Sequence, residues 1–434
     1  MTSSGKTALD AAVRAGRGER IDWRFRSIAP ALAGLTLDEA AARRANLFGD
    51  GFFGPFVVLG AAELAHNLRT MARWCAERGV VLAPHGKTTM APELFARQLA
   101  YGAWGITAAN AGHVRIYRTF GVSRILLANQ LVDPSGLRWL AGELAADPDF
   151  EFACWVDSVR GVELMTDALS EAPRPVDVLV ELGGEGGRTG VRDSATAYAV
   201  AEAVAKSPAL RLRGTGGYEG ALSHHSDTTA LAKISSYIDG VRDLAVSFAE
   251  KGLLADGPVY VTAGGSAYFD RVVDELTKPW PDGLDVLPIL RSGAYLTHDD
   301  GFYREISPLG AHPRINGVER FRPALHAWAQ VTSKPSAELA LLTAGKRDLP
   351  YDEGMPEPQL LRKDGMVNAL TGHTVPKMND QHTFLTLPAD SPVEVGDWVR
   401  LGVSHPCTTF DKWPLLPVVD TDGETVIDFV RTWF

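Results

Sequence analysis

The stretch VVLAPHGKTTM, residues 80–90, joins an apolar run to a glycine, a lysine and a threonine. Its first four residues, Val80–Ala83, predict a buried strand. Gly86-Lys87-Thr88 has the ending of a phosphate-binding P-loop, but that loop needs a glycine five residues before Gly86, where Val81 stands. The stretch therefore predicts a strand followed by a lysine. From the residues alone, this lysine could hold a phosphate, form a covalent bond or lie in an ordinary surface turn.

Strand-like apolar runs recur along the chain and alternate with amphipathic segments. In residues 61–78, apolar side chains at spacings of three and four predict one face of a helix. The strand-like runs are residues 80–84, 105–109, 124–128, 151–156, 176–182, 211–218, 258–264 and 286–292. About eight strand–helix units over roughly 240 residues match the size of a (β/α)8 barrel. An open doubly wound sheet would show the same alternation, so the pattern alone leaves both folds open.

The pattern changes after about residue 310. Short apolar runs such as AWAQVTS (327–333) and DWVRLGV (397–403) are separated there by Pro, Gly and Asp, which predicts an antiparallel β domain. We therefore expect three parts. Residues 1–59 form an N-terminal segment whose end contributes to the β domain, residues 60–310 form the barrel, and residues 311–434 form the C-terminal β domain.

The composition indicates a globular protein. The chain has 434 residues, of which 45% are hydrophobic and 22% charged, and its net charge is −10. Because no long basic run is present, nucleic acid and anionic membranes are not expected as partners. No segment approaches the ~18 apolar residues of a membrane span, and residues 1–16 lack the apolar core of a signal peptide. Three cysteines make no disulfide framework, which suits a cytoplasmic protein.

Polar and glycine residues stand where the predicted strands end. In a barrel, the carboxyl ends of the strands form the active site. Polar residues end many strands, so each one alone is weak evidence. Lys87 after the first strand and Gly264-Gly265-Ser266 after the seventh are more informative, because barrels often bind phosphate beside their last two strands. A lysine and a phosphate pocket together suggest pyridoxal 5′-phosphate (PLP), with Lys87 as the amine that forms a Schiff base.

An ordered set of motifs between residues 84 and 407 extends this interpretation. The motifs are Pro84-His85-Gly86-Lys87-Thr88, Gly187-Arg188-Thr189-Gly190-Val191, Tyr218-Glu219-Gly220, Gly264-Gly265-Ser266, Arg291-Ser292-Gly293-Ala294-Tyr295 and Ser404-His405-Pro406-Cys407. With them the chain resembles the fold type III PLP enzymes of the alanine-racemase-type barrel. Within these it is similar to the D-serine dehydratase-like and D-threonine aldolase-like group. The resemblance implies a PLP-binding (β/α)8 barrel with an antiparallel β domain, a small D-amino acid substrate and a homodimer.

The resemblance also implies roles for single residues. Lys87 would carry the cofactor and move the proton of the substrate Cα, and Arg188 would lie beside the PLP ring. The other residues expected around the cofactor are Tyr218, Gly265, Ser266, Gly293 and Tyr295. From the residues alone, a surface salt bridge is favoured for Arg188, and Tyr218 could equally pack on its neighbours at the end of the barrel.

His405-Pro406-Cys407 is a candidate metal site. Residues i and i+2 of an extended chain point to the same side, so His405 and Cys407 could bind one ion there. An imidazole and a thiolate favour Zn²⁺ among divalent metals. Two ligands are few, and the resemblance is what makes a metal expected. It also implies that D-threonine aldolases tend to carry an aspartate at the position of Cys407.

These observations predict a PLP- and metal-dependent dehydratase, an ammonia-lyase acting on D-3-hydroxy amino acids such as D-serine or D-threonine. Its products would be a 2-oxo acid and ammonia. Hydroxide is a poor leaving group, which is why a Lewis acid near the β-hydroxyl fits this chemistry. The alternatives are an aldolase that cleaves Cα–Cβ, a racemase that needs no metal, and a non-catalytic PLP carrier.

Overall fold

Eight parallel strands form one sheet in the computed structural model, which describes residues 3–434 and side chains from residue 8 onward. Residues 1 and 2, the start of the predicted N-terminal segment, lie outside the described residues. The strands are β2 (Val81–Leu82), β3 (Ile106–Ala108), β4 (Arg124–Gln130), β5 (Glu151–Val156), β6 (Val176–Leu182), β7 (Leu210–Gly217), β8 (Val259–Ala263) and β9 (Val286–Leu290). Each of the eight strands overlaps one of the strand-like runs predicted from the sequence.

The strand order is β2-β9-β8-β7-β6-β5-β4-β3, and the two ends of this order meet. His85, just after β2, forms a parallel bridge with Thr107 of β3. The backbone N–H of Thr107 donates to the Pro84 carbonyl at 2.9 Å, and that of Trp104 donates to Leu82 at 2.7 Å. This order confirms the predicted barrel and excludes the open doubly wound sheet, because a doubly wound sheet reverses its strand order and leaves two free edges.

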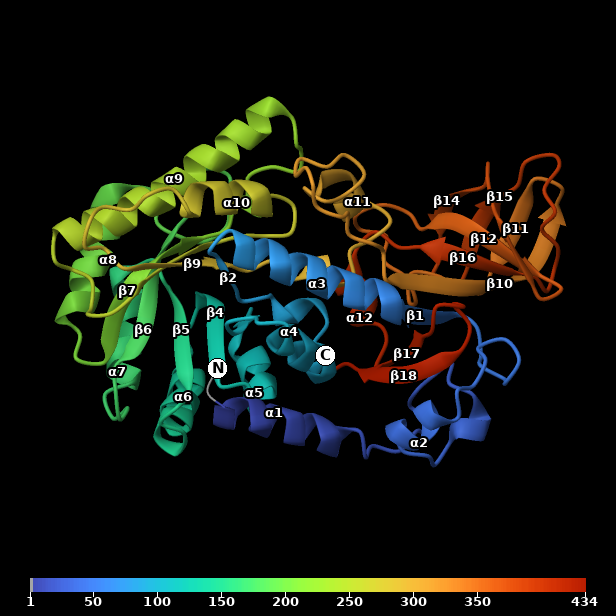
Figure 1. The fold of residues 1–434 in the computed structure, drawn as a ribbon, viewed down its shortest axis with the longest axis horizontal. Helices are drawn as coiled ribbons and strands as arrows, with labels where there is room; N and C mark the ends of the chain where they lie inside the picture. Colours follow the sequence, from blue (N-terminus) through green and yellow to red (C-terminus); the bar gives the residue numbers. More distant parts are fainter. Residues whose placement is uncertain (1–2) are drawn as a thin grey trace.

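Helices cover the outside of the barrel (Figure 1). They are α3 (Ala61–Glu77), α4 (Pro92–Ala100), α5 (Ala111–Thr119), α6 (Pro134–Ala146), α7 (Val159–Ala168), α8 (Ser194–Lys206), α9 (Thr228–Glu250) and α10 (Phe269–Leu276). Several begin at capping side chains that follow a strand. Asn110, for instance, accepts the N–H of His113 at the start of α5. Some polar residues at the strand ends therefore cap helices and do not form part of an active site.

Side chains fill the inside of the barrel. Trp155 and Leu179 are buried there together with Tyr260 and small residues from other strands, Ala83 and Ala153. Alternation of large and small inward side chains packs the barrel interior as a core. The cavity of the protein must therefore lie above the strands, at their carboxyl ends.

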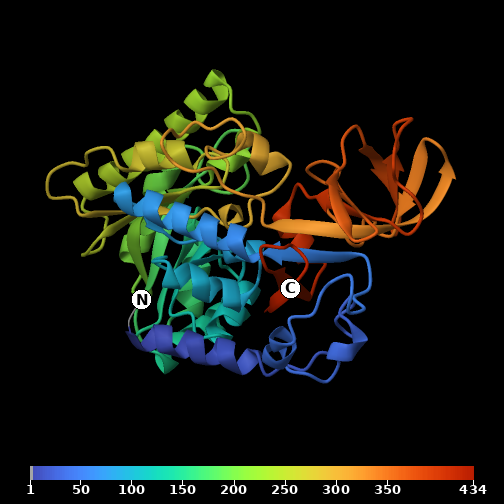
Figure 2. The same cartoon turned by 45° about the vertical axis from the view of Figure 1, so that its right-hand side comes forward.

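A second, antiparallel sheet lies beside the barrel (Figures 1 and 2). Its order is β13-β12-β16-β10-β1-β17-β18, and β11, β15 and β14 extend from β10. The strands are β1 (Phe56–Gly60), β10 (Leu325–Ser336), β11 (Leu339–Leu342), β12 (Glu357–Lys363), β13 (Met366–Ala369), β14 (Thr374–Met378), β15 (Thr383–Thr386), β16 (Trp398–Gly402), β17 (Leu415–Val419) and β18 (Val426–Arg431). β1 pairs with β10 and β17, so an N-terminal segment completes this sheet. The domain boundaries near residues 59 and 310 stay a prediction.

The remaining helices are short or peripheral: α1 (Ser3–Gly16), α2 (Leu37–Ala42), α11 (Phe302–Ile306) and α12 (Pro406–Phe410). α11 and α12 matter for the site, because they follow the barrel and β16 respectively. No helix in the described part of the chain is long and apolar enough to cross a membrane.

Asn67 of α3 ties the barrel to the chain that leads into β10. Its side chain is fully buried. Its amide nitrogen donates to the carbonyls of Leu296, at 3.0 Å, and Arg322, at 2.8 Å, and its amide oxygen accepts the N–H of Arg322 at 2.9 Å. One side chain thus satisfies three backbone groups, of which the Leu296 carbonyl is buried.

We expect Asn67→Leu to lower the free energy of unfolding by about 3 kcal/mol, because each buried backbone group left without a partner costs about 1–3 kcal/mol. Urea unfolding followed by circular dichroism would measure this loss. Asn368→Leu is the matched control, since Asn368 lies exposed on β13. Equal stability of the two variants would contradict the assigned role of Asn67.

Candidate functional site

One large cavity, of about 470 Å³, opens where the carboxyl ends of the barrel strands face the β domain. Most of the site residues expected from the sequence line it: Lys87, Arg188, Tyr218, Gly265, Ser266, Gly293, His405 and Cys407. Tyr295 is a correction to that expectation. Its side chain is buried in the core, where Gln98 Nε2 donates to its phenol oxygen at 3.3 Å. The helical turn Ala294–Leu296 directs Tyr295 away from the cavity.

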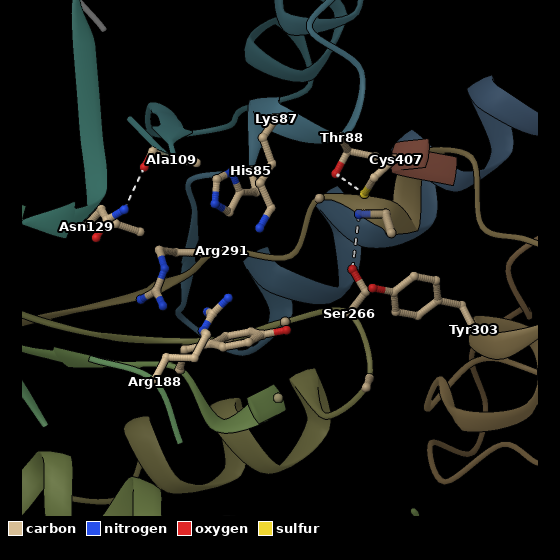
Figure 3. Close-up of a pocket in the computed structure, with 18 of the residues that line it drawn as sticks. His85, Lys87, Thr88, Ala109, Asn129, Arg188, Ser266, Arg291, Tyr303 and Cys407 are labelled. Atoms are coloured by element: carbon tan, nitrogen blue, oxygen red, sulfur yellow. Dashed lines mark hydrogen bonds between the residues drawn. The ribbon is translucent and has the colours of Figure 1, made fainter. Parts of the chain in front are cut away.

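Lys87 lies in a short helical turn, Gly86–Thr88, directly after β2. Figure 3 shows its amine pointing into the same space as the guanidinium groups of Arg188 and Arg291. Burial lowers the pKa of Lys87; Cys407 opposes this, and the two arginines lower the pKa further. Lys87 therefore has more unprotonated amine at neutral pH than a surface lysine. That is the form that attacks a carbonyl group or accepts a proton.

Arg188 and Tyr218 form a stacked pair on the cavity wall. The Arg188 guanidinium lies 4.6 Å from the centroid of the Tyr218 ring. Burial raises the pKa of Tyr218 to about 12, so its phenol stays protonated and can donate a hydrogen bond. The backbone N–H of Tyr218 donates to the hydroxyl of Tyr237 at 3.0 Å, which fixes the turn after β7. The pair thus offers a flat surface and hydrogen-bond donors to a ligand.

The glycine turn after β8 differs from expectation. The backbone N–H groups of Gly264 and Gly265, expected to be free for a phosphate, donate to the Glu219 carboxylate at 2.9 and 2.8 Å. Glu219 is fully buried, and burial raises its pKa although these two N–H groups and Arg291 favour its charged form. A phosphate at Gly265 would have to compete with this carboxylate. The sequence pattern could not reveal this, because it does not show which side chain reaches the turn.

Ser266 and Gly293 hold the neighbouring loop close to the lysine. Ser266 Oγ accepts the N–H of Ala294 at 3.1 Å, and this bond joins the loops after β8 and β9 (Figure 3). A Cβ atom at Gly293 would lie 2.6 Å from the His85 carbonyl oxygen and 2.8 Å from Thr88 Oγ1. Only glycine allows this approach. The loop after β9 therefore packs directly on the turn that carries Lys87.

Arg291 is a fixed cation at the floor of the cavity. It stands in a sequence motif at a strand end but was not among the site residues expected from the sequence. It is 3% exposed, and it donates to Thr262 Oγ1 at 2.6 Å and to the Gly217 carbonyl at 2.5 Å. Its guanidinium also lies 5.1 Å from the ring of Trp155. These contacts hold one positive charge under the cavity, where it can attract an anionic ligand.

His405 and Cys407 come together for a different reason than the one inferred from the sequence. The chain is not extended through both residues: His405 precedes α12, and Cys407 lies in the first turn of this helix. His405 Nδ1 lies 2.6 Å from Asp352 Oδ2, and the Cys407 thiol donates to Thr88 Oγ1 at 3.6 Å. Burial lowers the pKa of His405, but Cys407 and Asp352 beside it outweigh burial and raise it to about 9.

At this position the protein offers a metal ion two side chains, His405 and Cys407. Among residues 3–434 there is no group of three or more His, Cys, Asp or Glu side chains placed to hold a metal. His405 and Cys407 both line the cavity, and the bond to Asp352 has the form seen behind many metal-bound histidines, where a carboxylate orients the ring. The donor types fit Zn²⁺ if the substrate or water completes its coordination.

Several cavity residues were not recognised from the sequence, and four of them come from α11 and from loops. Phe302 and Tyr303 come from α11, Glu353 comes from the loop before β12, and His224 comes from the loop after β7. The centroid of the His224 ring lies 5.7 Å from that of Phe302. No periodicity or motif marks such residues, because tertiary packing alone brings their loops to the cavity.

Comparisons with known proteins support this picture. Residues 60–271 match the family model described as "Alanine racemase, N-terminal domain", and residues 324–419 match the model described as "Putative serine dehydratase domain". The first match ends inside the barrel region, and the second covers the antiparallel sheet from β10 to β17.

Two characterised relatives match most of the chain. The chain is 28% identical to a D-threonine aldolase from Arthrobacter sp over 372 residues, 84% of this chain and 88% of that protein. It is 24% identical to a 3-hydroxy-D-aspartate aldolase from Paracoccus denitrificans over 357 residues, 79% of this chain and 87% of that protein.

Solved structures show the same fold. The D-threonine aldolase from Filomicrobium marinum has a TM-score of 0.74 at 26% identity, covering 88% of this chain and 95% of that one. The D-threo-3-hydroxyaspartate dehydratase from Delftia sp. HT23 has a TM-score of 0.69 at 21% identity, covering 88% and 98%. Also matching are two variants of a dehydratase of this name, a histidine-to-alanine variant and a cysteine-to-alanine variant in the metal-free form. The predicted resemblance to this group of enzymes is thereby confirmed.

The three cysteines should differ in reactivity. Burial raises the pKa of both Cys75 and Cys154 to about 12, so almost no thiolate forms on them at about pH 8. Cys407 is partly exposed in the cavity. We expect an alkylating reagent to label Cys407 rapidly and the other two only after unfolding, as followed by peptide mass spectrometry. Rapid labelling that persists in Cys407→Ala would contradict the burial of the other two.

Proposed function

We propose that this chain, in which an alanine racemase N-terminal domain is joined to a serine dehydratase-type domain, is a PLP- and metal-dependent dehydratase of D-3-hydroxy amino acids. D-serine and D-threonine are the expected substrates, and a 2-oxo acid and ammonia are the expected products. One observation carries the proposal: a buried lysine and a histidine–cysteine pair face each other across one cavity.

The cavity fits PLP. Lys87 would hold the cofactor aldehyde, and Arg188 and Tyr218 offer a stacked surface with hydrogen-bond donors beside it. Ser266, Gly293 and the fixed charge of Arg291 would receive its anionic groups. The bound cofactor supplies an electron sink that makes a neighbouring Cα–H bond acidic. The two matched domain models and the similarity to the D-threonine aldolase from Arthrobacter sp support this assignment.

A divalent metal, with Zn²⁺ the expected ion, fits His405 and Cys407. Asp352 orients the His405 ring through Nδ1 and leaves Nε2 available. The metal would supply a Lewis acid for the β-hydroxyl group of the substrate. Support comes from the dehydratase variants named above, in which a histidine and a cysteine two positions apart are replaced, the second in a metal-free form.

Lys87 then has two tasks that its surroundings allow. Its partly unprotonated amine would bond to the aldehyde of PLP, and, once free again, it could accept the proton from the substrate Cα. Thr88, the next residue, contacts the Cys407 thiol at 3.6 Å. The proton acceptor, Lys87, and the candidate metal ligand, Cys407, are therefore held close together, because Cys407 contacts the residue next to Lys87. In the proposed function they would act on the Cα and the Cβ of the substrate.

A D-threonine aldolase is the second candidate. The 28% identity to the Arthrobacter aldolase over 84% of this chain favours it. Cleavage of Cα–Cβ needs a base at the β-hydroxyl, whereas elimination needs an acid there. The resemblance implies that D-threonine aldolases tend to carry an aspartate at the position of Cys407. Because this chain has a cysteine there, we favour elimination. A racemase would need no His405–Cys407 pair, and a non-catalytic carrier would need no β domain. The homodimer and the cytoplasmic location stay predictions.

Borohydride reduction of the PLP-loaded protein should fix the cofactor to Lys87, because the buried amine there is the one that bonds to the aldehyde. Peptide mass spectrometry after digestion would locate the modification. Lys87→Ala should carry none, while Lys233→Ala, which removes an exposed lysine bound to the Leu222 carbonyl, should be labelled like the wild type. A label on another lysine would contradict the assignment of Lys87 as the lysine that binds PLP.

With D-threonine and zinc, we expect 2-oxobutyrate and ammonia as the main products. Chelation should abolish the reaction, and Cys407→Ala should weaken zinc binding by about 10-fold or more, since a metal ligand is lost. Cys154→Ala, which removes a buried thiol from β5, is the control. Chromatography of the products would decide between the two candidates. If glycine and acetaldehyde were the main products, the proposed dehydratase activity would be wrong and the aldolase activity would take its place.

A further inference from the structure

We infer that Glu353 selects against substrates with an anionic side chain, so that the cavity takes D-3-hydroxy amino acids whose side chain is neutral or cationic. This inference rests on the proposed function and adds the substrate class. It is carried by Glu353, which comes from the loop before β12 and lines the same cavity as Arg188 and Arg291.

The charges around the cavity are distributed unevenly. The barrel wall carries the cations Arg188 and Arg291 beside Lys87, and Figure 3 shows the two arginines on one side of the Lys87 amine with Cys407 on the other. The one carboxylate that lines this wall, Glu181, is engaged by Gln130 Nε2 at 2.7 Å and Thr189 Oγ1 at 3.1 Å. The cofactor phosphate and the substrate α-carboxylate are anions, and the barrel wall is where the cavity can receive them.

The wall formed by the β domain has the opposite character. Glu353 lines the cavity there and joins none of the ion pairs found within residues 3–434. The histidine of this wall, His405, is already paired with Asp352 at 2.6 Å. Burial raises the pKa of Tyr303 well above its ordinary value, and Glu353 is among the negative groups that raise it further. The Glu353 carboxylate therefore acts on the cavity without a neutralising partner.

The residues beside Glu353 keep it in place. Asp352 accepts from the Thr408 hydroxyl at 3.1 Å and bonds to His405, so it is anchored to α12 and to the residue before it. On the other side, Ser404 Oγ donates to the Gly354 carbonyl at 3.0 Å. Both neighbours are thus tied to residues 404–408. These bonds hold the backbone of Glu353 beside the cavity, so its carboxylate stays near the wall.

The substrate side chain points toward this wall. In the proposed function the substrate Cα lies at Lys87 and its β-hydroxyl lies at His405 and Cys407. The Thr88–Cys407 contact of 3.6 Å shows how close the lysine turn and the β-domain wall are. The remaining substituent on Cβ therefore extends along the wall that carries Glu353. A methyl group there meets no charge conflict, whereas a carboxylate meets a like charge in a partly desolvated space.

A matched pair of substrates tests this inference. D-threonine and D-threo-3-hydroxyaspartate differ by a methyl and a carboxylate group on Cβ. For the PLP- and zinc-loaded protein, we expect kcat/KM for D-threonine to exceed that for D-threo-3-hydroxyaspartate by about 10-fold or more. Glu353→Gln should reduce this ratio by about 10-fold, because the amide keeps the shape and removes the charge. Glu338→Gln is the control: it removes an equal charge at the exposed end of β10–β11 and should leave the ratio unchanged.

Binding separates this inference from the proposed function. D-2-aminobutyrate and D-aspartate lack the β-hydroxyl, and their affinities for the loaded protein can be measured through the absorbance change of the bound cofactor. Preferred binding of D-2-aminobutyrate that Glu353→Gln abolishes, without turnover of any D-3-hydroxy amino acid, would uphold Glu353 and overturn the dehydratase. Turnover with the same substrate ratio in the wild type and Glu353→Gln would overturn Glu353 alone. Binding of neither amino acid would overturn both.

Discussion

Closure of the barrel between β2 and β3 is the constraint on which the site depends. β2 has only two residues, and the seam is made by the Thr107 N–H bonded to the Pro84 carbonyl, with the Thr107 hydroxyl bonded to the Ala83 carbonyl at 2.6 Å. The chain must leave the strand at once, and it enters the turn that carries Lys87. The reactive lysine is therefore built into the seam itself, where backbone bonds on both sides hold it.

The barrel then provides a rigid, positive wall around this lysine. Arg291 and Glu219 are both buried, and each is bonded to backbone groups of neighbouring strand ends. Burying charged groups is costly unless each one is paired and hydrogen-bonded, and here the two opposite charges lie within one network. This network orders the loops after β7, β8 and β9. Gly293 completes it by letting the last of these loops touch the lysine turn.

The β domain supplies the second wall, and here the chemistry is decided. α12 follows β16; it brings Cys407 into contact with Thr88, and His405 lines the same cavity. The loop before β12 adds Asp352 and Glu353, held by bonds to the same segment. In the proposed function, the barrel would hold the cofactor, and the residues of the β-domain wall would contact the β-hydroxyl group and the side chain of the substrate.

Sequence alone determined the strand–helix alternation, the β domain and the position of Lys87, because periodicity and local motifs are properties of neighbouring residues. It also brought most of the cavity residues to notice through short motifs at strand ends. Tertiary structure decided what local pattern does not contain. It turned Tyr295 into the core, gave the Gly265 N–H to Glu219, and placed Cys407 on a helix. It alone brought Glu353 to the cavity, since the contacts that hold this loop join residues about fifty positions apart in the chain.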